Sequence, residues 1–129
     1  MQPFALESGE TLPPLTPAYN TYGQLNEADT NVFWICHALT ANSDAEDWWP
    51  GLVGEGFTLY PADYFIVCVN MLSSSYGSTS PKSIDPKTGE PYGLNFPLVT
   101  TRDQARFFDL VADYLGIRRI RLLMGGSMG

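Results

Sequence analysis

The chain has 129 residues, with 14 acidic against 7 basic side chains and a formal net charge of −7. This length fits one domain, and a hydrophobic share of 44% is that of a globular protein rather than a disordered acidic tail. The acidic balance argues against nucleic-acid binding, which needs a clustered basic face. No run approaches the ~18 apolar residues of a membrane span. The first residues also lack the pattern of a signal peptide, so we expect a cytoplasmic protein that binds no membrane.

The chain begins with two short predicted strands, at residues 4–6 and 18–22. Between them, residues 7–17 hold three prolines and Gly9, which we expect to exclude regular structure. Residues 32–36 and 64–69 are continuous apolar runs, typical of parallel strands that are covered on both faces. The intervening residues 37–61 are irregular and predict a loop with a short helix.

The second half of the chain predicts a long loop, one helix and one strand. Residues 73–97 show no periodicity, and a loop of this length is usually functional or mobile. Residues 101–115 predict a helix with a capping box of Thr101 and Gln104 and a C-terminal cap at Gly116. Residues 120–124 predict a third buried strand. The order of elements favours an α/β fold with a mostly parallel sheet. The apolar face expected for the helix consists of Ala105, Phe108, Ala112 and Leu115.

Residues 125–129 read Gly-Gly-Ser-Met-Gly and match the G-x-S-x-G pattern directly after a predicted strand. In a nucleophile elbow the serine occupies a strained turn, and the flanking glycines leave room for the backbone to double back. The pattern therefore predicts Ser127 as a nucleophile. A plain Gly-Ser turn without chemistry is the alternative.

A nucleophile elbow also needs an oxyanion hole, made by the N–H after the serine and a second N–H from the loop after an earlier strand. Met128 supplies the first N–H. The second is expected in the turn after residues 32–36, where we nominate the N–H of Leu39, with Ala38 as the close competitor.

His37 is the only histidine, and its position argues against a catalytic triad. Folds with this elbow place the acid and then the histidine after the serine, whereas His37 lies far before Ser127. We expect its ring instead to support the oxyanion turn by hydrogen bonds. Asp103, Asp109 and Asp113 are expected on the solvated face of the helix, so no general base or orienting acid is identified.

Cys36 and Cys68 each end an apolar run and are expected to be buried free thiols. With one histidine and no close spacing of cysteine and histidine, the sequence predicts no metal site.

Together these motifs resemble the homoserine O-acetyltransferase family, acyltransferases of the α/β-hydrolase fold that act in methionine biosynthesis. The resemblance runs from about Leu6 to Gly129. It is carried by residues 36–40 (Cys-His-Ala-Leu-Thr), 47–49 (Asp-Trp-Trp), 64–65 (Tyr-Phe), 77–79 (Gly-Ser-Thr), 91–93 (Pro-Tyr-Gly), 96–97 (Phe-Pro), 101–103 (Thr-Arg-Asp) and 125–129.

The resemblance implies that residues 1–129 are the N-terminal portion of a single α/β-hydrolase domain, cut at the nucleophile elbow. It implies Ser127 as the acylated nucleophile, with the N–H groups of Leu39 and Met128 as oxyanion-hole donors. The family's catalytic Asp and His, its helical lid and an arginine for the substrate carboxylate would lie beyond Gly129. The implied substrates are acetyl-CoA and L-homoserine, with no cofactor and a homodimeric full-length enzyme. We expect the 129-residue chain alone to be almost inactive.

Three alternatives remain open. In the first two, the chain is part of a serine esterase or of a homoserine succinyltransferase of the same fold. In the third, it is a non-catalytic α/β fragment that binds a partner. Ala41, Ser80 and the serines at residues 73–75 depart from the family's usual pattern, and these changes bear on the acyl donor more than on the reaction type.

Overall fold

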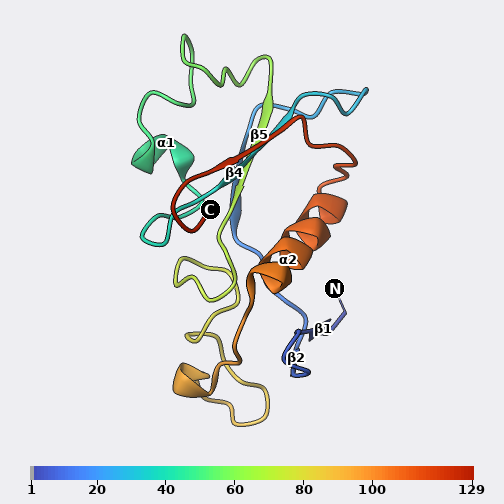
Figure 1. The fold of residues 1–129 in the computed structure, drawn as a ribbon, viewed down its shortest axis with the longest axis vertical. Coiled ribbons are helices and arrows are strands. Elements are labelled where there is room, and N and C mark those ends of the chain that lie inside the picture. The colour runs from blue at the N-terminus through green and yellow to red at the C-terminus, as the bar shows by residue number, and fades with distance from the viewer. Residues whose placement is uncertain (1) are drawn as a thin grey trace.

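Figure 1 shows the computed structural model, which describes residues 2–129. Its main sheet has the strand order β3–β5–β4–β6, with bounds Tyr19–Tyr22 for β3, Phe65–Val69 for β5, Val32–Cys36 for β4 and Leu122–Gly125 for β6. β3 runs antiparallel to β5, whereas β5, β4 and β6 are parallel. The expected mostly parallel sheet is confirmed, and the two apolar runs form its central strands.

The two faces of the sheet bury separate groups of side chains, because neighbours along a strand point to opposite faces. Trp34 and Val67 pack with the long helix α2 (Thr101–Tyr114). Ile35 and Ile66 pack with the short helix α1 (Ala45–Trp48) and the loop that follows it. The central strands are therefore covered on both sides, as their continuous apolar runs predict.

The N-cap of α2 lies one residue before the expected one. The hydroxyl of Thr100 accepts the N–H of Asp103 at 3.2 Å, and the Asp103 carboxylate accepts the N–H of Thr100 at 3.1 Å. The predicted capping box of Thr101 and Gln104 is wrong because the Gln104 side chain is engaged elsewhere. Its amide bonds the N–H and the carbonyl of Leu72 at 2.9 and 2.8 Å.

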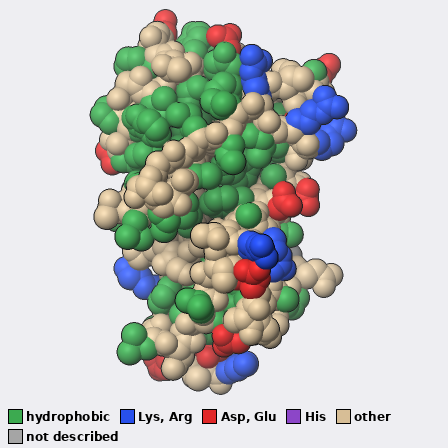
Figure 2. Space-filling model, viewed as in Figure 1, with side chains coloured by type: hydrophobic (Ala, Val, Ile, Leu, Met, Phe, Trp, Pro, Cys, Tyr) green, Lys and Arg blue, Asp and Glu red, His purple; other side chains and the backbone are tan. Residues whose placement is uncertain are grey.

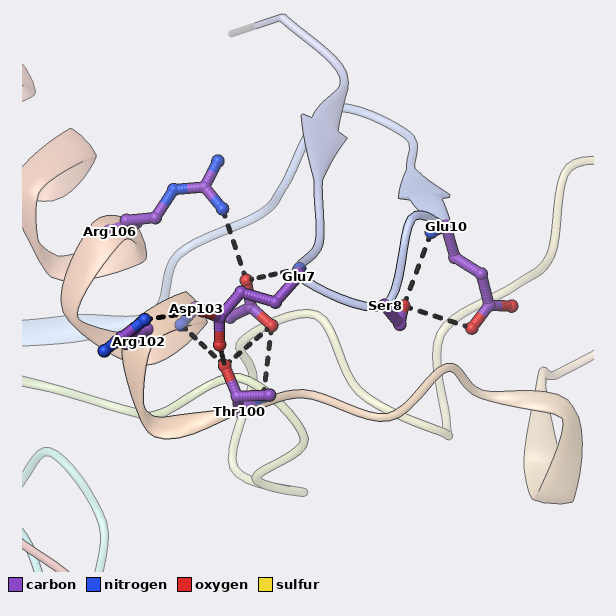
Figure 3. A network of polar contacts seen from close by, with 7 residues as sticks. All are labelled: Glu7, Ser8, Glu10, Thr100, Arg102, Asp103 and Arg106. Atoms are coloured by element: carbon purple, nitrogen blue, oxygen red, sulfur yellow. Dashed lines mark hydrogen bonds and ion pairs between the residues drawn. The ribbon is translucent and has the colours of Figure 1, made fainter.

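The expectation that Asp103 is solvated is also wrong, since its side chain is completely buried. Figure 3 shows its carboxylate accepting the N–H of Glu7 at 3.1 Å and the guanidinium of Arg106 at 3.3 Å, besides the bonds to Thr100. Burial alone raises the pKa of Asp103, but the hydrogen bonds from Thr100 and Glu7 and the charge of Arg106 outweigh burial and lower it below the ordinary value. One of these partners, Glu7, lies in the N-terminal segment, and the helical pattern of residues 101–115 does not reveal it.

The side of α2 that is buried is only partly the expected one. Its buried apolar residues are Phe107, Val111 and Ala112. Of the predicted face, Ala112 is buried and Phe108 is half-buried, but Ala105 is exposed. Ala105 is exposed because it lines a cavity between α2 and β6. The C-terminal cap is as expected, since Gly116 adopts a φ of +74°.

The N-terminal segment contains a small hairpin that the sequence did not predict. β1 (Phe4–Ala5) pairs antiparallel with β2 (Thr11–Leu12), within the stretch expected to be irregular. The three prolines do not prevent this pairing because they all follow β2 in the chain. Gly9, with a φ of +89°, lies in the turn between the strands.

Within residues 2–129, β6 forms the edge of the sheet and is not the buried strand that the sequence predicts. It pairs with β4 on one side, and Leu122 and Leu123 are 44% and 62% exposed. Figure 2 shows hydrophobic side chains gathered across the middle of the face on which β6 lies. The apolar run therefore identified a strand correctly but not its depth in the sheet.

The long loop of residues 73–97 is tied to the N-terminal part of the chain. The hydroxyls of Ser78 and Thr79 accept the N–H groups of Ala18 and Thr16 at 3.0 and 2.9 Å. One short 3-10 helix, η1 (Gly93–Asn95), interrupts the loop. Within residues 2–129, no helix has the length and apolar character needed to cross a bilayer.

Candidate active site

The predicted nucleophile lies in a strained turn directly after β6. Ser127 has a φ of +61°, which is uncommon for a residue with a side chain and recurs at functional sites. The N–H of Gly129 donates to the carbonyl of Gly126 at 3.1 Å and closes the turn. A Cβ atom on Gly125 would lie 2.9 Å from the carbonyl oxygen of Gly129, closer than such contacts occur. The backbone therefore doubles back as a nucleophile elbow requires.

The elbow lies against the carboxyl end of β4. A Cβ atom on Gly129 would overlap the carbonyl oxygen of Cys36 and lie 3.0 Å from that of His37. The next residues form a turn in which the N–H of Ala41 donates to the carbonyl of Ala38 at 3.0 Å. Leu39 occupies the middle of this turn, with its side chain 71% exposed. The structure thus brings the predicted nucleophile beside the predicted oxyanion turn.

The two predicted oxyanion donors are not engaged within the described part of the chain. No hydrogen bond among residues 2–129 uses the backbone N–H of Leu39 or of Met128. The N–H of Ala38 is unused in the same region, so hydrogen bonding does not separate Ala38 from Leu39. Free amides at this edge are what an oxyanion requires, because they must be available when negative charge develops.

His37 is 1% exposed and is held by hydrogen bonds at both ring nitrogens. Nδ1 lies 2.8 Å from the carbonyl oxygen of Ala38, which can only accept, so Nδ1 carries the proton. Nε2 accepts the N–H of Met71 at 3.1 Å. Both nitrogens are therefore occupied by backbone groups, and the ring joins the start of the oxyanion turn to the loop after β5.

A cavity of about 420 Å³ adjoins the elbow on the α2 side of the sheet. It is bounded by Trp34 of β4, by Gln104 of α2 and by Met128 and Gly129 of the elbow. The indole Nε1 of Trp34 is buried and has no hydrogen-bond partner among residues 2–129. Most of the lining is apolar, and its polar side chains are those of Thr100, Thr101, Gln104 and Asp109.

The cysteines lie on opposite faces of the sheet and are both free. Cys68 is buried, whereas Cys36 is partly exposed at the cavity, so the expected burial holds fully for Cys68 alone. Burial raises the pKa of both thiols, that of Cys68 to about 12. Neither is therefore a thiolate near neutral pH, which leaves Ser127 as the nucleophile candidate at this edge.

Sequence reasoning did not single out Asn70, the first residue after β5, which is 2% exposed. Its position in the sequence is the feature that could have identified it. A polar residue directly after a buried parallel strand lies at the carboxyl edge of the sheet, where α/β proteins bind their ligands. Asp103 is excluded as an orienting acid, since its carboxylate oxygens are occupied at the cap of α2.

Known proteins resemble this chain over nearly its whole length. No family model matches the chain. Among curated relatives, the homoserine O-acetyltransferase of Chlorobium chlorochromatii is 48% identical over 128 residues, covering 99% of this chain and 36% of the relative. That of Moorella thermoacetica is 48% identical over 134 residues, covering 96% of this chain and 36% of the relative. The chain therefore spans little more than a third of the length of these relatives.

Solved structures agree on the fold. The homoserine O-acetyltransferase of Bacillus anthracis is 36% identical with a TM-score of 0.87, and the match covers 100% of this chain and 39% of that one. An acetylester hydrolase from Corynebacterium glutamicum is 28% identical with a TM-score of 0.84, covering 98% of this chain and 35% of that one. The expected resemblance is confirmed: the chain is related to the homoserine O-acetyltransferases over its whole length, and it has the fold of part of an α/β hydrolase.

Proposed function

We propose that this chain supplies the nucleophile and the oxyanion hole of an acyltransferase that moves an acetyl group from acetyl-CoA to the hydroxyl of L-homoserine. The observation that carries the proposal is Ser127 at a φ of +61°, in a turn where glycines on both sides exclude a Cβ atom. The similarity to homoserine O-acetyltransferases supports acyl transfer to homoserine. On this proposal the enzyme acts in methionine biosynthesis, in the cytoplasm and without a cofactor.

The reaction would run in two halves through an acyl-serine. Oγ of Ser127 attacks the thioester carbonyl carbon while its proton passes to a general base. The N–H groups of Leu39 and Met128 stabilise the oxyanion that forms. The C–S bond then breaks, and the CoA sulfur takes the proton from the base and leaves as the thiol. In the second half, the homoserine hydroxyl gives its proton to the base and attacks the acyl carbon. The bond between the acyl carbon and Oγ of Ser127 then breaks, and Oγ takes that proton from the base.

The general base and its orienting acid do not come from this chain on our proposal. Its single histidine is bound at both nitrogens by backbone groups, and Asp103 is occupied at the cap of α2. We therefore assign the base and the acid to the portion of the relatives that this chain does not span. The 129-residue chain alone should then release almost no CoA from acetyl-CoA, because activation of the serine needs that base.

A serine esterase is the second candidate, favoured by the similarity to an acetylester hydrolase. The two activities share the acyl-serine and differ in the acceptor, which is water in an esterase. An acyl donor other than acetyl-CoA, such as a succinyl thioester, would leave the same residues in the same roles.

The test is a chimera in which residues 1–129 replace the matching segment of the Bacillus anthracis homoserine O-acetyltransferase. CoA release from acetyl-CoA is measured with and without L-homoserine, and from succinyl-CoA in parallel. Hydrolysis of p-nitrophenyl acetate is measured in the same preparations. The Ser127→Ala chimera is the control.

We expect CoA release that depends on homoserine and is abolished by Ser127→Ala. Ester hydrolysis without any effect of homoserine would instead favour the esterase. Activity that survives Ser127→Ala in full would overturn the role of the elbow.

A further inference from the structure

Asn70 joins the loops that follow the two central strands. Its side-chain oxygen accepts the N–H of Ser43 at 2.8 Å, and its amide nitrogen donates to Oγ of Ser43 and to the carbonyl of Tyr76, both at 2.9 Å. One side chain therefore holds the loop after β4 and the loop after β5 at once. Because these bonds are buried, losing them would leave donors and acceptors unpaired.

The backbone N–H and carbonyl of Asn70 also make hydrogen bonds. Its N–H donates to the carbonyl of Ala18 at 2.9 Å, and its carbonyl accepts the hydroxyl of Ser78 at 2.5 Å. The hydroxyl of Ser43 in turn donates to the side-chain oxygen of Asn20 in β3 at 2.7 Å. Asn70 itself is thus anchored to the sheet and is a rigid point from which the loop after β4 is held.

Two consecutive residues, Asn70 and Met71, hold the segment 37–43 at its two ends. The Met71 N–H binds Nε2 of His37 at 3.1 Å, where the segment begins. The Asn70 side chain binds Ser43, where the segment ends. Leu39, the nominated oxyanion donor, lies between these two anchors. The loop after β4 is therefore fixed from the end of β5 rather than by its own turn alone.

We propose that Asn70 is a positioning residue for the oxyanion hole. It acts through Ser43 to keep the backbone N–H of Leu39 directed at the oxyanion beside Ser127, and it touches no substrate. This inference rests on the proposed function, since it assigns a role within the same site. A displacement of about 1 Å in such a group is enough to lower the rate by about 10²-fold.

The chain offers a matched control at the opposite edge of the sheet. Asn31, just before β4, is 9% exposed. Its side-chain oxygen accepts the N–H of Asn26 at 3.0 Å, and its amide nitrogen donates to the carbonyls of Gln24 and Asp63 at 2.9 and 3.3 Å. Asn31 therefore has the same side chain, similar burial and as many side-chain hydrogen bonds as Asn70, but it lies at the opposite end of β4 from the elbow.

The experiment compares Asn70→Ala, Asn70→Asp and Asn31→Ala in the chimera described above. The acylation burst with p-nitrophenyl acetate counts active sites, so kcat is obtained per functional site even where a variant folds in lower yield. KM for homoserine and the melting temperature are measured alongside. Asn70→Asp keeps the oxygen that accepts the Ser43 N–H, and it decides the outcome if Asn70→Ala does not fold.

We expect Asn70→Ala to lower kcat by about 10²-fold with little change in KM, Asn70→Asp to recover part of the loss, and Asn31→Ala to lower the melting temperature without lowering kcat. An unchanged kcat in both Asn70 variants, or an equal loss in Asn31→Ala, would overturn the inference. A chimera without acyl transfer, or one indifferent to Ser127→Ala, would instead refute the proposed function, so the two failures are distinguishable.

Discussion

Gly125 and Gly129 are in direct contact across the turn that carries Ser127, with no space for a Cβ atom on either residue. Gly129 also lies directly against the carbonyl oxygen of Cys36 at the end of β4. The position of the nucleophile relative to the oxyanion turn therefore depends on backbone atoms that touch without intervening side chains.

Substitution of Gly125 tests this contact, and Gly126 provides the control. A Cβ atom at Gly125 would meet Gly129 and would lie 3.1 Å from Cβ of Cys36, whereas at Gly126 nothing lies within 4 Å. We expect Gly125→Ala to destabilise the fold by about 1–3 kcal/mol and to abolish acylation in the chimera. Gly126→Ala should retain both. Thermal unfolding and the acylation burst measure the difference, and equal behaviour of the two variants would contradict the geometry.

Replacing His37 tests whether its ring supports the oxyanion turn or acts as a general base. His37→Phe keeps the ring but leaves the Met71 N–H and the Ala38 carbonyl without partners, which should cost about 1–3 kcal/mol of unfolding free energy. We expect kcat in the chimera to fall without reaching the level of Ser127→Ala. His37→Gln, which retains a donor and an acceptor, should recover part of the loss. A fall to the Ser127→Ala level with unchanged stability would indicate a base instead.

The buried carboxylate of Asp103 should make the free energy of unfolding depend on pH in the acid range. Its pKa is lowered in the folded state from an ordinary value of 3.8, so the folded state favours the charged carboxylate. The resulting stabilisation is complete above about pH 4 to 5 and is lost as the pH falls through the lowered pKa. Melting temperatures between pH 2 and 7 should show a steeper acid loss for the unsubstituted chain than for Asp103→Asn. Asp109→Asn, which changes an exposed carboxylate on the same helix, should follow the unsubstituted chain.

The thiols should be slow to react while the chain is folded. Burial raises the pKa of Cys68 to about 12 and also raises that of Cys36, so the thiolate fraction near pH 8 is small for both. Labelling with a chromogenic disulfide should detect no reaction at Cys68 and a slow one at Cys36. Both thiols should react at once in guanidinium chloride. Fast labelling of Cys68 under native conditions would contradict its burial.

The sequence predicted the elements whose signal is local. The apolar runs identified β4 and β5, and residues 125–129 identified the elbow, because each pattern lies within a few neighbouring residues. The cap of α2 was placed one residue late because both Thr100 and Thr101 precede a suitable partner by three positions. Two non-local contacts accompany the observed choice: the Glu7 N–H binds Asp103 from 96 residues away, and Leu72 engages the Gln104 side chain.

The parts that sequence reasoning missed are non-local in the same way. β6 was expected to be buried, but within residues 2–129 no strand pairs with its outer edge, and its own residues do not encode which segments cover it. The role of Asn70 depends on bonds to Ser43, 27 residues earlier, and to Tyr76, six residues later. A lone asparagine after a strand carries no spacing pattern that would reveal such partners.

The outer edge of β6 has a practical consequence for handling the 129-residue chain. Leu122 and Leu123 are exposed along a strand that, within residues 2–129, pairs only with β4. An apolar strand edge of this kind is a template for pairing with another strand, and natural proteins usually cover or charge it. The isolated chain should therefore self-associate as its concentration rises, and a lysine in place of Leu123 should keep it monodisperse.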